Sequence, residues 1–377
     1  FIYVNQICGQ DELVFDGASF ALHADRSLAF QLPEFQECVV VTRWKREGGT
    51  WRCENGPVTP DIEGDAADYC ACVLGLRDYV NKNGFKGVVL GLSGGVDSAL
   101  CAAMAVDALG SDRVHAVMLP YRYTSEDSLK DAADCAKALG LRYDIVPIAD
   151  AVEGLEKTLA EMFKGTNRDI TEENLQSRAR GTILMSISNK FGPMVVTTGN
   201  KSEMSVGYAT LYGDMNGGYN PIKDLYKTEV FRLSELRNRW KPADAKGPNG
   251  VVIPQNIITK PPTAELRENQ KDQDSLPPYD ILDGILERLV EREESVSQIV
   301  DAGYEKETVL KVAKLLDIAE YKRRQAAPGV KVTLKNFGRD RRYPITNRFR
   351  DNGAKPAEPD QSLSSGAIAA RMEVIDF

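Results

Sequence analysis

Hydrophobic positions follow two different patterns along this 377-residue chain. In residues 1–55, short apolar runs alternate with turns rich in Gly and Asp, which is typical of β-strands. Residues 48–64 are rich in Gly and Pro and predict a linker, and the apolar period from Asp65 to about Val80 predicts a helix. Four short apolar runs are too few for an independent domain, so we expect this region to be the end of a larger one.

From residue 86 on, apolar runs of strand length alternate with longer amphipathic segments. Strands are predicted over 86–93, 113–120, 141–148 and 193–200, and helices over 96–110, 125–140, 151–163, 172–190, 229–240, 279–294 and 306–319. This alternation predicts an α/β fold in which helices cover both faces of a parallel sheet. Ligands of such sheets bind beyond the C-terminal ends of the strands. The segment LSGGVDS ends the first predicted strand there, and TTGNKSE ends the fourth.

Composition and charge exclude several classes of protein. With 42% hydrophobic residues and a net charge of −8, the chain has a globular composition and lacks the basic balance of a nucleic-acid binder. No apolar run reaches the length of a membrane span. Only two histidines occur, which disfavours a histidine-based triad or zinc site. The seven cysteines, an odd number without a CxxC pair, predict reduced thiols and a cytoplasmic location.

The sequence LGLSGGVDSAL, residues 90–100, predicts a phosphate-binding loop. It joins a strand to a helix, so backbone N–H groups at the helix N-terminus are free for an anion, and Gly94 and Gly95 let that anion approach. Ser93 and Ser98 add hydroxyl donors. Asp97 repels a phosphate unless a cation lies between them, and we therefore expect Mg²⁺ at this position. The simpler interpretation is a tight turn with an aspartate cap.

The hexapeptide SGGVDS matches SGGxDS, the signature loop of ATP pyrophosphatases, which cleave ATP between the α and β phosphates. Such enzymes transfer AMP to a substrate oxygen, which accounts for the missing lysine of loops that transfer the γ-phosphoryl group. The signature alone leaves open GMP synthetase, asparagine and argininosuccinate synthetases, tRNA-modifying enzymes and NAD synthetase. The alternative from a different class is a nucleotide-binding regulatory module without turnover.

Four further segments resemble NAD synthetase, and are most similar to the synthetase part of its bacterial glutamine-dependent form. These segments are ENLQSRARGTILMSISN (173–189), 196–233, 261–283 and 321–345. The resemblance extends from Asp65 to Phe349. Residues 3–20 resemble the end of a nitrilase-type glutaminase domain, whose catalytic residues lie upstream of this point, so we expect no glutaminase reaction.

The resemblance divides the chain into four parts and implies a reaction. The expected parts are the end of a glutaminase domain (1–55), a linker (56–64), an NAD synthetase domain of the ATP pyrophosphatase fold (65–350) and a C-terminal tail (351–377). The implied reaction adenylates deamido-NAD with ATP and lets ammonia displace AMP, giving NAD⁺ and pyrophosphate. Ammonia is the expected nitrogen donor for this chain. The expected partners are small molecules and a second copy of the chain, with no nucleic acid and no membrane.

The resemblance also assigns roles to particular residues. Asp97 and Lys227 are the expected catalytic residues, and Asp97 and Glu203 the expected Mg²⁺ ligands. The expected ATP contacts are Gly91, Leu92, Ser93, Gly94, Gly95, Val96, Asp97, Ser98, Thr198, Lys227 and Thr263. The expected deamido-NAD contacts are Asn174, Arg178, Glu203 and Lys322.

Three positions depart from the ammonia-dependent branch of the family. Tyr321 stands where a histidine is common, Leu211 where a lysine is common, and Asn220 near a usual aspartate. The substrate contacts of the loop from Leu211 to Asn220 therefore stay open. Arg180 is a candidate phosphate partner, although Arg178 and Arg180 cannot both point the same way on one helix. The segment 322–350 carries ten basic residues and one acid, and its first part is expected to close over the anionic substrates.

Overall fold

Four parallel strands form the central sheet of the structure, a computed structural model that describes residues 1–268 and 270–354. The strands are β8 (Val88–Gly91), β9 (Val114–Met118), β10 (Arg142–Ile145) and β11 (Met194–Val195), in the order β10-β9-β8-β11. The chain runs from β8 outward to β10 and then returns to place β11 on the other side of β8. The strand order therefore reverses between β8 and β11, and a ligand crevice is expected at such a point.

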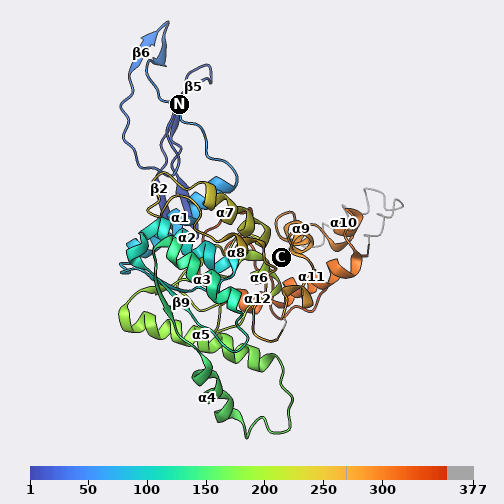
Figure 1. Ribbon diagram of the computed structural model, residues 1–377. Helices are drawn as coiled ribbons and strands as arrows, with labels where there is room; N and C mark the ends of the chain where they lie inside the picture. The colour runs from blue at the N-terminus through green and yellow to red at the C-terminus, as the bar shows by residue number, and fades with distance from the viewer. Residues whose placement is uncertain (269, 355–377) are drawn as a thin grey trace, which may run out of the picture.

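Helices cover both faces of this sheet, as the sequence pattern predicted (Figure 1). Val88 and Leu90 of β8 pack in the larger core with α1, α2, α3 and α7, whereas Val89 between them packs in a second core with α4 and α5. Successive side chains of a strand point to opposite faces, so a strand buried on both sides reads as a continuous apolar run. The predicted α/β fold is confirmed.

The helices extend over the following residues. They are α1 (Asp65–Lys82), α2 (Val96–Leu109), α3 (Glu126–Leu139), α4 (Ala149–Leu159), α5 (Ile170–Phe191), α6 (Lys201–Val206), α7 (Lys227–Arg239), α8 (Gln255–Thr259), α9 (Tyr279–Val290), α10 (Val296–Asp301), α11 (Lys306–Ile318) and α12 (Glu320–Arg323). Short 3₁₀ turns occur at Ser111–Arg113 and Asp272–Asp274. The sequence pattern missed α6, α8, α10 and α12, because helices of four to six residues are too short to show a 3.6-residue period.

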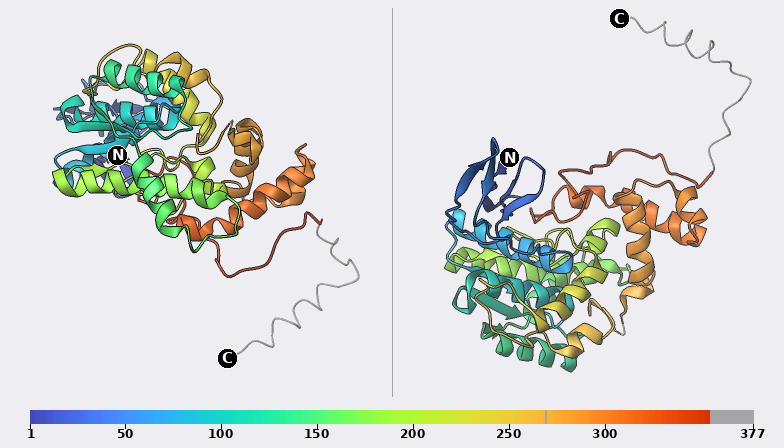
Figure 2. Two further views of the ribbon diagram at one scale, coloured as in Figure 1. Left: turned by 60° about the horizontal axis from the view of Figure 1, so that its bottom comes forward. Right: turned by 90° about the horizontal axis from the view of Figure 1, so that it is seen from above.

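A separate apolar cluster holds the C-terminal helices together. Leu282 and Leu286 of α9 pack with Val309 and Val312 of α11, and Val206 at the end of α6 belongs to the same cluster. These helices form a group at one side of the α/β part, visible in orange in Figure 2. The packing brings α9 into contact with both α6 and α7. It therefore places C-terminal side chains next to the end of the sheet.

The N-terminal residues form antiparallel strands. These are β1 (Ile2–Tyr3), β2 (Ile7–Gln10), β3 (Leu13–Asp16), β4 (Phe20–Leu22), β5 (Leu28–Gln31), β6 (Trp44–Glu47) and β7 (Thr50–Cys53). The β2–β3 hairpin packs on α1, where a Cβ on Gly9 would lie 2.9 Å from the Cα of Gly75, so this close approach requires glycine. The remaining strands project from the α/β part (Figure 1).

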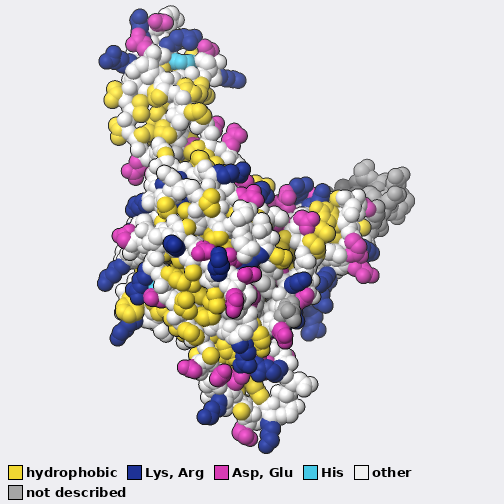
Figure 3. Space-filling model, in the orientation of Figure 1, with side chains coloured by type: hydrophobic (Ala, Val, Ile, Leu, Met, Phe, Trp, Pro, Cys, Tyr) yellow, Lys and Arg dark blue, Asp and Glu magenta, His cyan; other side chains and the backbone are white. Residues whose placement is uncertain are grey.

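The prediction that the short apolar runs of residues 1–55 form β-strands was wrong for residues 38–43, in the run CVVVTRW. These residues have no strand structure, and the side chains of Val39 and Val41 are 97% and 81% exposed. Strands form instead at Leu28–Gln31 and on either side of Gly48 and Gly49, where a partner strand is present. Apolar side chains gather on the surface of this projection (Figure 3). Such exposed apolar surface is typical of a region that packs against another part of a protein.

Three further features bear on the sequence predictions. All seven cysteines are free, and Cys70 and Cys72 are buried in α1. Within the described residues, no helix is long and apolar enough to cross a membrane. The predicted tail, 351–377, lies outside the described residues from position 355 onward.

Candidate active site

A cavity of about 430 Å³ lies beyond the C-terminal ends of β8 and β11. The loop after β8 and the loop after β11 form two of its walls, and further walls come from α5 and from the segment that follows α8. The cavity includes most of the residues that the sequence assigned to the two substrates. Those that line it are Gly91, Leu92, Ser93, Gly95, Val96, Asp97, Ser98, Asn174, Thr198, Glu203, Lys227, Thr263 and Lys322.

The glycine loop is held in shape by its own hydroxyl groups. Ser98 Oγ accepts from the backbone N–H of Ser93 at 3.2 Å and donates to the carbonyl of Gly95 at 3.0 Å, while Ser93 Oγ accepts from the N–H of Gly95. Gly94 has a φ of +81°, and a Cβ there would lie 2.4 Å from the Ser128 carbonyl. Helix α2 begins without a side-chain cap from its N-cap residue Gly95, so its first N–H groups face the cavity as an anion site.

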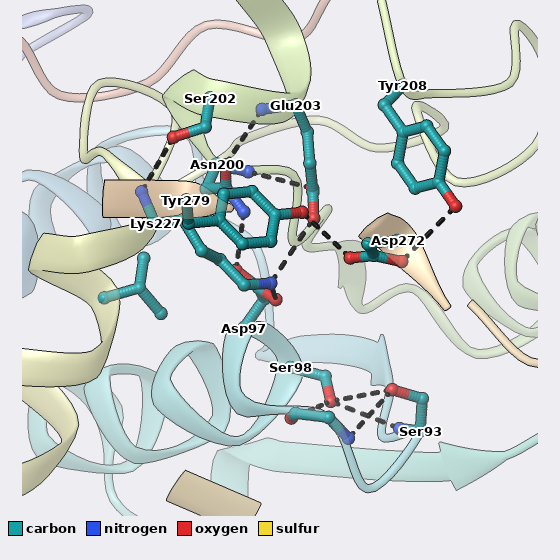
Figure 4. Close-up of polar contacts among 12 residues, drawn as sticks. Ser93, Asp97, Ser98, Asn200, Ser202, Glu203, Tyr208, Lys227, Asp272 and Tyr279 are labelled. Atoms are coloured by element: carbon teal, nitrogen blue, oxygen red, sulfur yellow. Dashed lines mark hydrogen bonds and ion pairs between the residues drawn. The ribbon is translucent and has the colours of Figure 1, made fainter. Parts of the chain in front are cut away.

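Two carboxylates and one ammonium group meet beside this loop (Figure 4). Lys227 Nζ lies 2.5 Å from Asp97 Oδ2 and 3.5 Å from Glu203 Oε1. Asn200 Nδ2 donates to Asp97 Oδ1 at 2.8 Å. Asn200 is also the N-cap of α6, where its side chain accepts from the Glu203 N–H at 3.0 Å and the Glu203 carboxylate faces the Asn200 N–H. The cap of α6 thus fixes both carboxylates relative to each other.

Burial and neighbouring charges change the proton affinity of this group. Burial, together with the negative charge of Asp97, raises the pKa of Glu203 from 4.5 to about 8. Burial alone would lower the pKa of Lys227, but Asp97 and Glu203 outweigh it and raise that pKa above its ordinary value. Lys227 therefore stays an ammonium ion, and the two carboxylates face a permanent positive charge.

Asp97 and Glu203 are the residues that would hold a hard divalent cation. Both carboxylates turn toward the same point, which the Lys227 ammonium approaches, and Mg²⁺ binds to one or two carboxylates together with substrate phosphates. Within residues 1–268 and 270–354, no cluster of three or more His, Cys, Asp or Glu side chains has the arrangement of a metal site. The remaining ligands would have to come from phosphate oxygens and water, as is usual for this ion.

The sequence-assigned contacts of the second substrate lie on several elements. Asn174 Oδ1 accepts from Thr210 Oγ1 at 2.9 Å, and Lys322 Nζ donates to the carbonyls of Gly207 and Ala209 at 2.7 and 2.6 Å. Thr263, an expected ATP contact, donates through Oγ1 to the carbonyl of Gln270 at 2.6 Å. These side chains place polar groups around the cavity without blocking it.

The two arginines of ENLQSRARG differ in their position relative to the cavity. Arg178 donates through Nε to the Leu211 carbonyl at 3.2 Å and is not among the described residues that line the cavity. Arg180 lines the cavity and donates to the Leu119 carbonyl at 2.9 Å, and burial lowers its pKa to about 10. The structure therefore gives Arg180 the more direct access to an anionic ligand, and the role of Arg178 in substrate binding stays a prediction.

Several polar residues of the site were not among those predicted from the sequence. Asp272 accepts from the hydroxyls of Tyr208 at 3.3 Å and Tyr279 at 2.8 Å, so a third carboxylate lies beside the charged group (Figure 4). Burial raises its pKa. Asn200 had a signal, since the spacing N-x-x-E in GNKSE is that of a helix capping box. Asp272 begins a three-residue 3₁₀ turn, which is too short to show a pattern, and had none.

The fold and the cavity define a class of protein: open parallel α/β domains with a ligand cavity where the strand order reverses and, here, an SGGxDS loop at the first strand. Residues 69–326 match the family described as NAD synthase. The chain therefore belongs to the NAD synthase family.

Individual relatives agree with this assignment. A glutamine-dependent NAD(+) synthetase of Rhodobacter capsulatus is 56% identical, and the match covers 93% of this chain and 63% of the relative. The solved structure of a glutamine-dependent NAD⁺ synthetase from Acinetobacter baumannii, in complex with ADP, is 45% identical with a TM-score of 0.64, covering 94% of this chain and 62% of that one. The chain thus spans less than two thirds of the length of these relatives.

A match to a shorter relative covers nearly all of that relative and a smaller part of this chain. The NH3-dependent NAD synthetase from Campylobacter jejuni is 25% identical with a TM-score of 0.53, and the match covers 68% of this chain and 94% of that chain.

Proposed function

We propose that this chain catalyses the ATP-dependent amidation of deamido-NAD to NAD⁺, with release of AMP and pyrophosphate. The observation that carries the proposal is the Lys227 ammonium between Asp97 and Glu203, directly beside the free N-terminus of α2. An anion site next to a fixed positive charge suits a reaction at the α phosphate of ATP. The family and the names of the relatives support the same reaction. The chain is thus proposed to be a ligase that forms a carbon–nitrogen bond.

The first step joins the two substrates. An oxygen of the nicotinate carboxylate attacks the α phosphorus of ATP, and the bond from that phosphorus to the bridging oxygen of pyrophosphate breaks. The N–H groups at the start of α2 and the Ser93 hydroxyl hold the phosphates, while the Ser98 hydroxyl keeps the loop in shape. Lys227 stabilises the negative charge that develops at the α phosphate, because a preorganised charge in a buried site needs no rearrangement during the reaction.

The second step forms the amide. Ammonia attacks the acyl carbon of the adenylate, the bond from that carbon to the AMP oxygen breaks, and one N–H proton is released. No covalent bond to the protein forms, so catalysis depends on positioning and on charge. Thr198 and Thr263 are proposed to contact ATP, and Asn174, Arg178 and Lys322 to contact deamido-NAD.

Mg²⁺ is the proposed cofactor, held by Asp97 and Glu203. When bound, it neutralises phosphate charge that would otherwise be repelled by Asp97. Asn200 orients Asp97 for this role through its 2.8 Å hydrogen bond, and the same side chain caps the helix that carries Glu203.

Residues 1–55 are proposed to be the end of a glutaminase domain, and residues 65–350 the synthetase domain. Ammonia is the proposed nitrogen donor, because the match to the NH3-dependent relative covers nearly all of that chain without needing the rest of the longer relatives. A dimer through the synthetase domain and a cytoplasmic location complete the proposal.

The test is a turnover assay with ATP, Mg²⁺, ammonium and deamido-NAD. We expect NAD⁺ and AMP in equal amounts. ATP binding without release of AMP would instead support a regulatory module that does not turn over. Replacing ammonium by glutamine should abolish almost all NAD⁺ formation, and glutamine-driven turnover would contradict the proposed nitrogen donor.

A further inference from the structure

The N-terminus of α7, which begins at Lys227, is capped by side chains of other helices. Its N-cap residue is Tyr226, whose side chain does not belong to the usual capping types. Instead, Ser202 Oγ of α6 accepts from the Lys227 N–H at 2.8 Å, and Asp283 Oδ2 of α9 accepts from the Thr228 N–H at 2.9 Å. Two of the N–H groups that a helix start leaves unpaired are thus satisfied from outside the helix.

The two capping side chains are also bonded to each other. The Ser202 hydroxyl donates to Asp283 Oδ1 at 2.5 Å. Ser202 is fully buried and Asp283 is 6% exposed, and neither is among the described residues that line the cavity. The Asp283 carboxylate therefore joins three helices at one point. Its negative charge also lies at the positive end of the α7 dipole, which favours this arrangement.

This junction lies directly behind the charged group of the site. Ser202 is adjacent in sequence to Glu203, and the N–H that Ser202 accepts belongs to Lys227 itself. The junction therefore fixes the backbone of α6 relative to that of α7, and with it the distance between the Glu203 carboxylate and the Lys227 ammonium. The ammonium has a long side chain with many rotamers, so a fixed backbone position limits where it can reach.

We propose that Ser202 and Asp283 are positioning residues that hold the Lys227 ammonium in place between Asp97 and Glu203. The proposal rests on the proposed function, because it concerns the residue to which the charge stabilisation is assigned. Ser202 and Asp283 act through Lys227 and not on the substrates. Misplacement of a catalytic group by about 1 Å costs on the order of 100-fold in rate, so loss of the junction should lower kcat.

Ser202→Ala tests the proposal against a matched control. The control is Ser234→Ala, which also removes a buried hydroxyl, one that donates to the Val230 carbonyl at 2.7 Å within α7. We expect Ser202→Ala to lower kcat roughly 10-fold to 100-fold with little change in the KM for ATP, and Ser234→Ala to leave kcat within about 3-fold. Equal kcat losses in both variants, with equal losses in Tm, would show a merely structural hydroxyl and overturn the proposal.

A double-mutant cycle with Lys227→Met tests whether Ser202 acts through Lys227. In the Lys227→Met background, Ser202→Ala should have almost no further effect on kcat, because the group it positions is already gone. The same fold loss in both backgrounds would overturn the proposal. Asp283→Asn serves as a second variant, since an amide cannot accept from both the Ser202 hydroxyl and the Thr228 N–H through two oxygens.

The cycle can also be measured on the free energy of unfolding in urea, which does not require turnover. If the unaltered chain forms no NAD⁺, the proposed function fails. A coupling between Ser202→Ala and Lys227→Met in urea unfolding would then still support the positioning of Lys227 by Ser202, and strictly additive losses would overturn it.

Discussion

Two lysines of this chain have similar chemical surroundings but different roles. Lys201 begins α6 and Lys227 begins α7, and each ammonium is buried against two carboxylates. Lys201 Nζ lies 2.8 Å from Asp224 and 2.6 Å from Glu291. Each ammonium also lies near an aromatic ring, 5.1 Å from that of Tyr226 for Lys201 and 5.3 Å from that of Tyr279 for Lys227.

The difference lies in the hydrogen-bond donors that remain. Lys201 Nζ also donates to Thr333 Oγ1 at 2.5 Å and to the Lys335 carbonyl at 3.0 Å, so protein oxygens use all three of its donors. Lys227 has one short contact and one at 3.5 Å, and it lines the cavity. The Lys201 ammonium, whose donors are all used, therefore binds the C-terminal segment to α6. The Lys227 ammonium has spare donors and can donate to a ligand.

Replacing Lys227 should have the largest effect, and on activity. We expect Lys227→Met to lower kcat by about 1,000-fold, because it removes the charge that stabilises the α phosphate. The free energy of unfolding should change by only about 1 kcal/mol, since water can screen the remaining carboxylates, Asp97 and Glu203, which are 16% and 18% exposed. Steady-state kinetics and urea unfolding measure the two effects. A normal kcat in this variant would show that the Lys227 ammonium has no catalytic role.

Replacing Lys201 should act on stability instead. We expect Lys201→Met to lower the free energy of unfolding by about 3 kcal/mol or more, because it leaves Asp224 and Glu291, 1% and 7% exposed, without a buried counterion. The KM for ATP in the folded fraction should stay within about 3-fold. Urea unfolding of both lysine variants, side by side, gives the measurement. A greater loss of stability in Lys227→Met than in Lys201→Met would reverse the assignment.

The open site should make stability depend on pH through Glu203. Its pKa is raised from 4.5 to about 8 in the folded protein, so folding takes up a proton between these values. The contribution of the protonated Glu203 carboxyl to the free energy of unfolding is therefore complete below pH 4.5. It is lost as the pH rises to about 8, by at most about 1.4 kcal/mol per pH unit. Glu203→Gln should reduce this slope, while Asp68 and Glu229, whose pKa values are also raised, supply the remainder. Glu235→Gln, at an exposed position of α7, should keep the full slope. Urea midpoints from pH 5 to 8 measure it.

A third lysine should show the smallest effect. Lys322 lines the cavity, but its Nζ is bonded to the carbonyls of Gly207 and Ala209 and not to a carboxylate. We expect Lys322→Ala to raise the KM for deamido-NAD about 5-fold, near 1 kcal/mol, with kcat almost unchanged. Lys314→Ala, at an exposed position of α11, is the control. An unchanged KM for deamido-NAD would remove Lys322 from the substrate site.

The sequence predicted the parts of the site that local patterns encode. The strand, the two glycines and Asp97 of the phosphate loop lie within one short segment. The alternation of strands and helices predicted that this segment lies at the C-terminal end of a parallel strand. The spacing of Asn200 and Glu203 is also local, and it is that of a helix capping box.

The rest depends on contacts between distant residues. Ser202 and Asp283 are 81 positions apart, and Lys201 and Glu291 are 90 positions apart. No period or motif signals such a pair, because the partners meet only through the packing of α9 on α6 and α7. For the same reason no local pattern distinguishes Lys201, whose donors are all used by protein oxygens, from Lys227, which has spare donors. Only the family resemblance singled out Lys227.

The place of β11 beside β8 also bears on how the chain folds. Strand β11 completes the sheet from the far side, and the hydrogen bond from Asn200 to Asp97 joins residues 103 positions apart. Closing so long a loop carries an entropic cost that must be met before the contact forms, so pairings of this kind slow folding. We therefore expect β8, α2 and β9 to assemble early and the two carboxylates to meet late. A nascent chain that ends before Met194 would already have the phosphate loop, yet it would have no second carboxylate to complete the site.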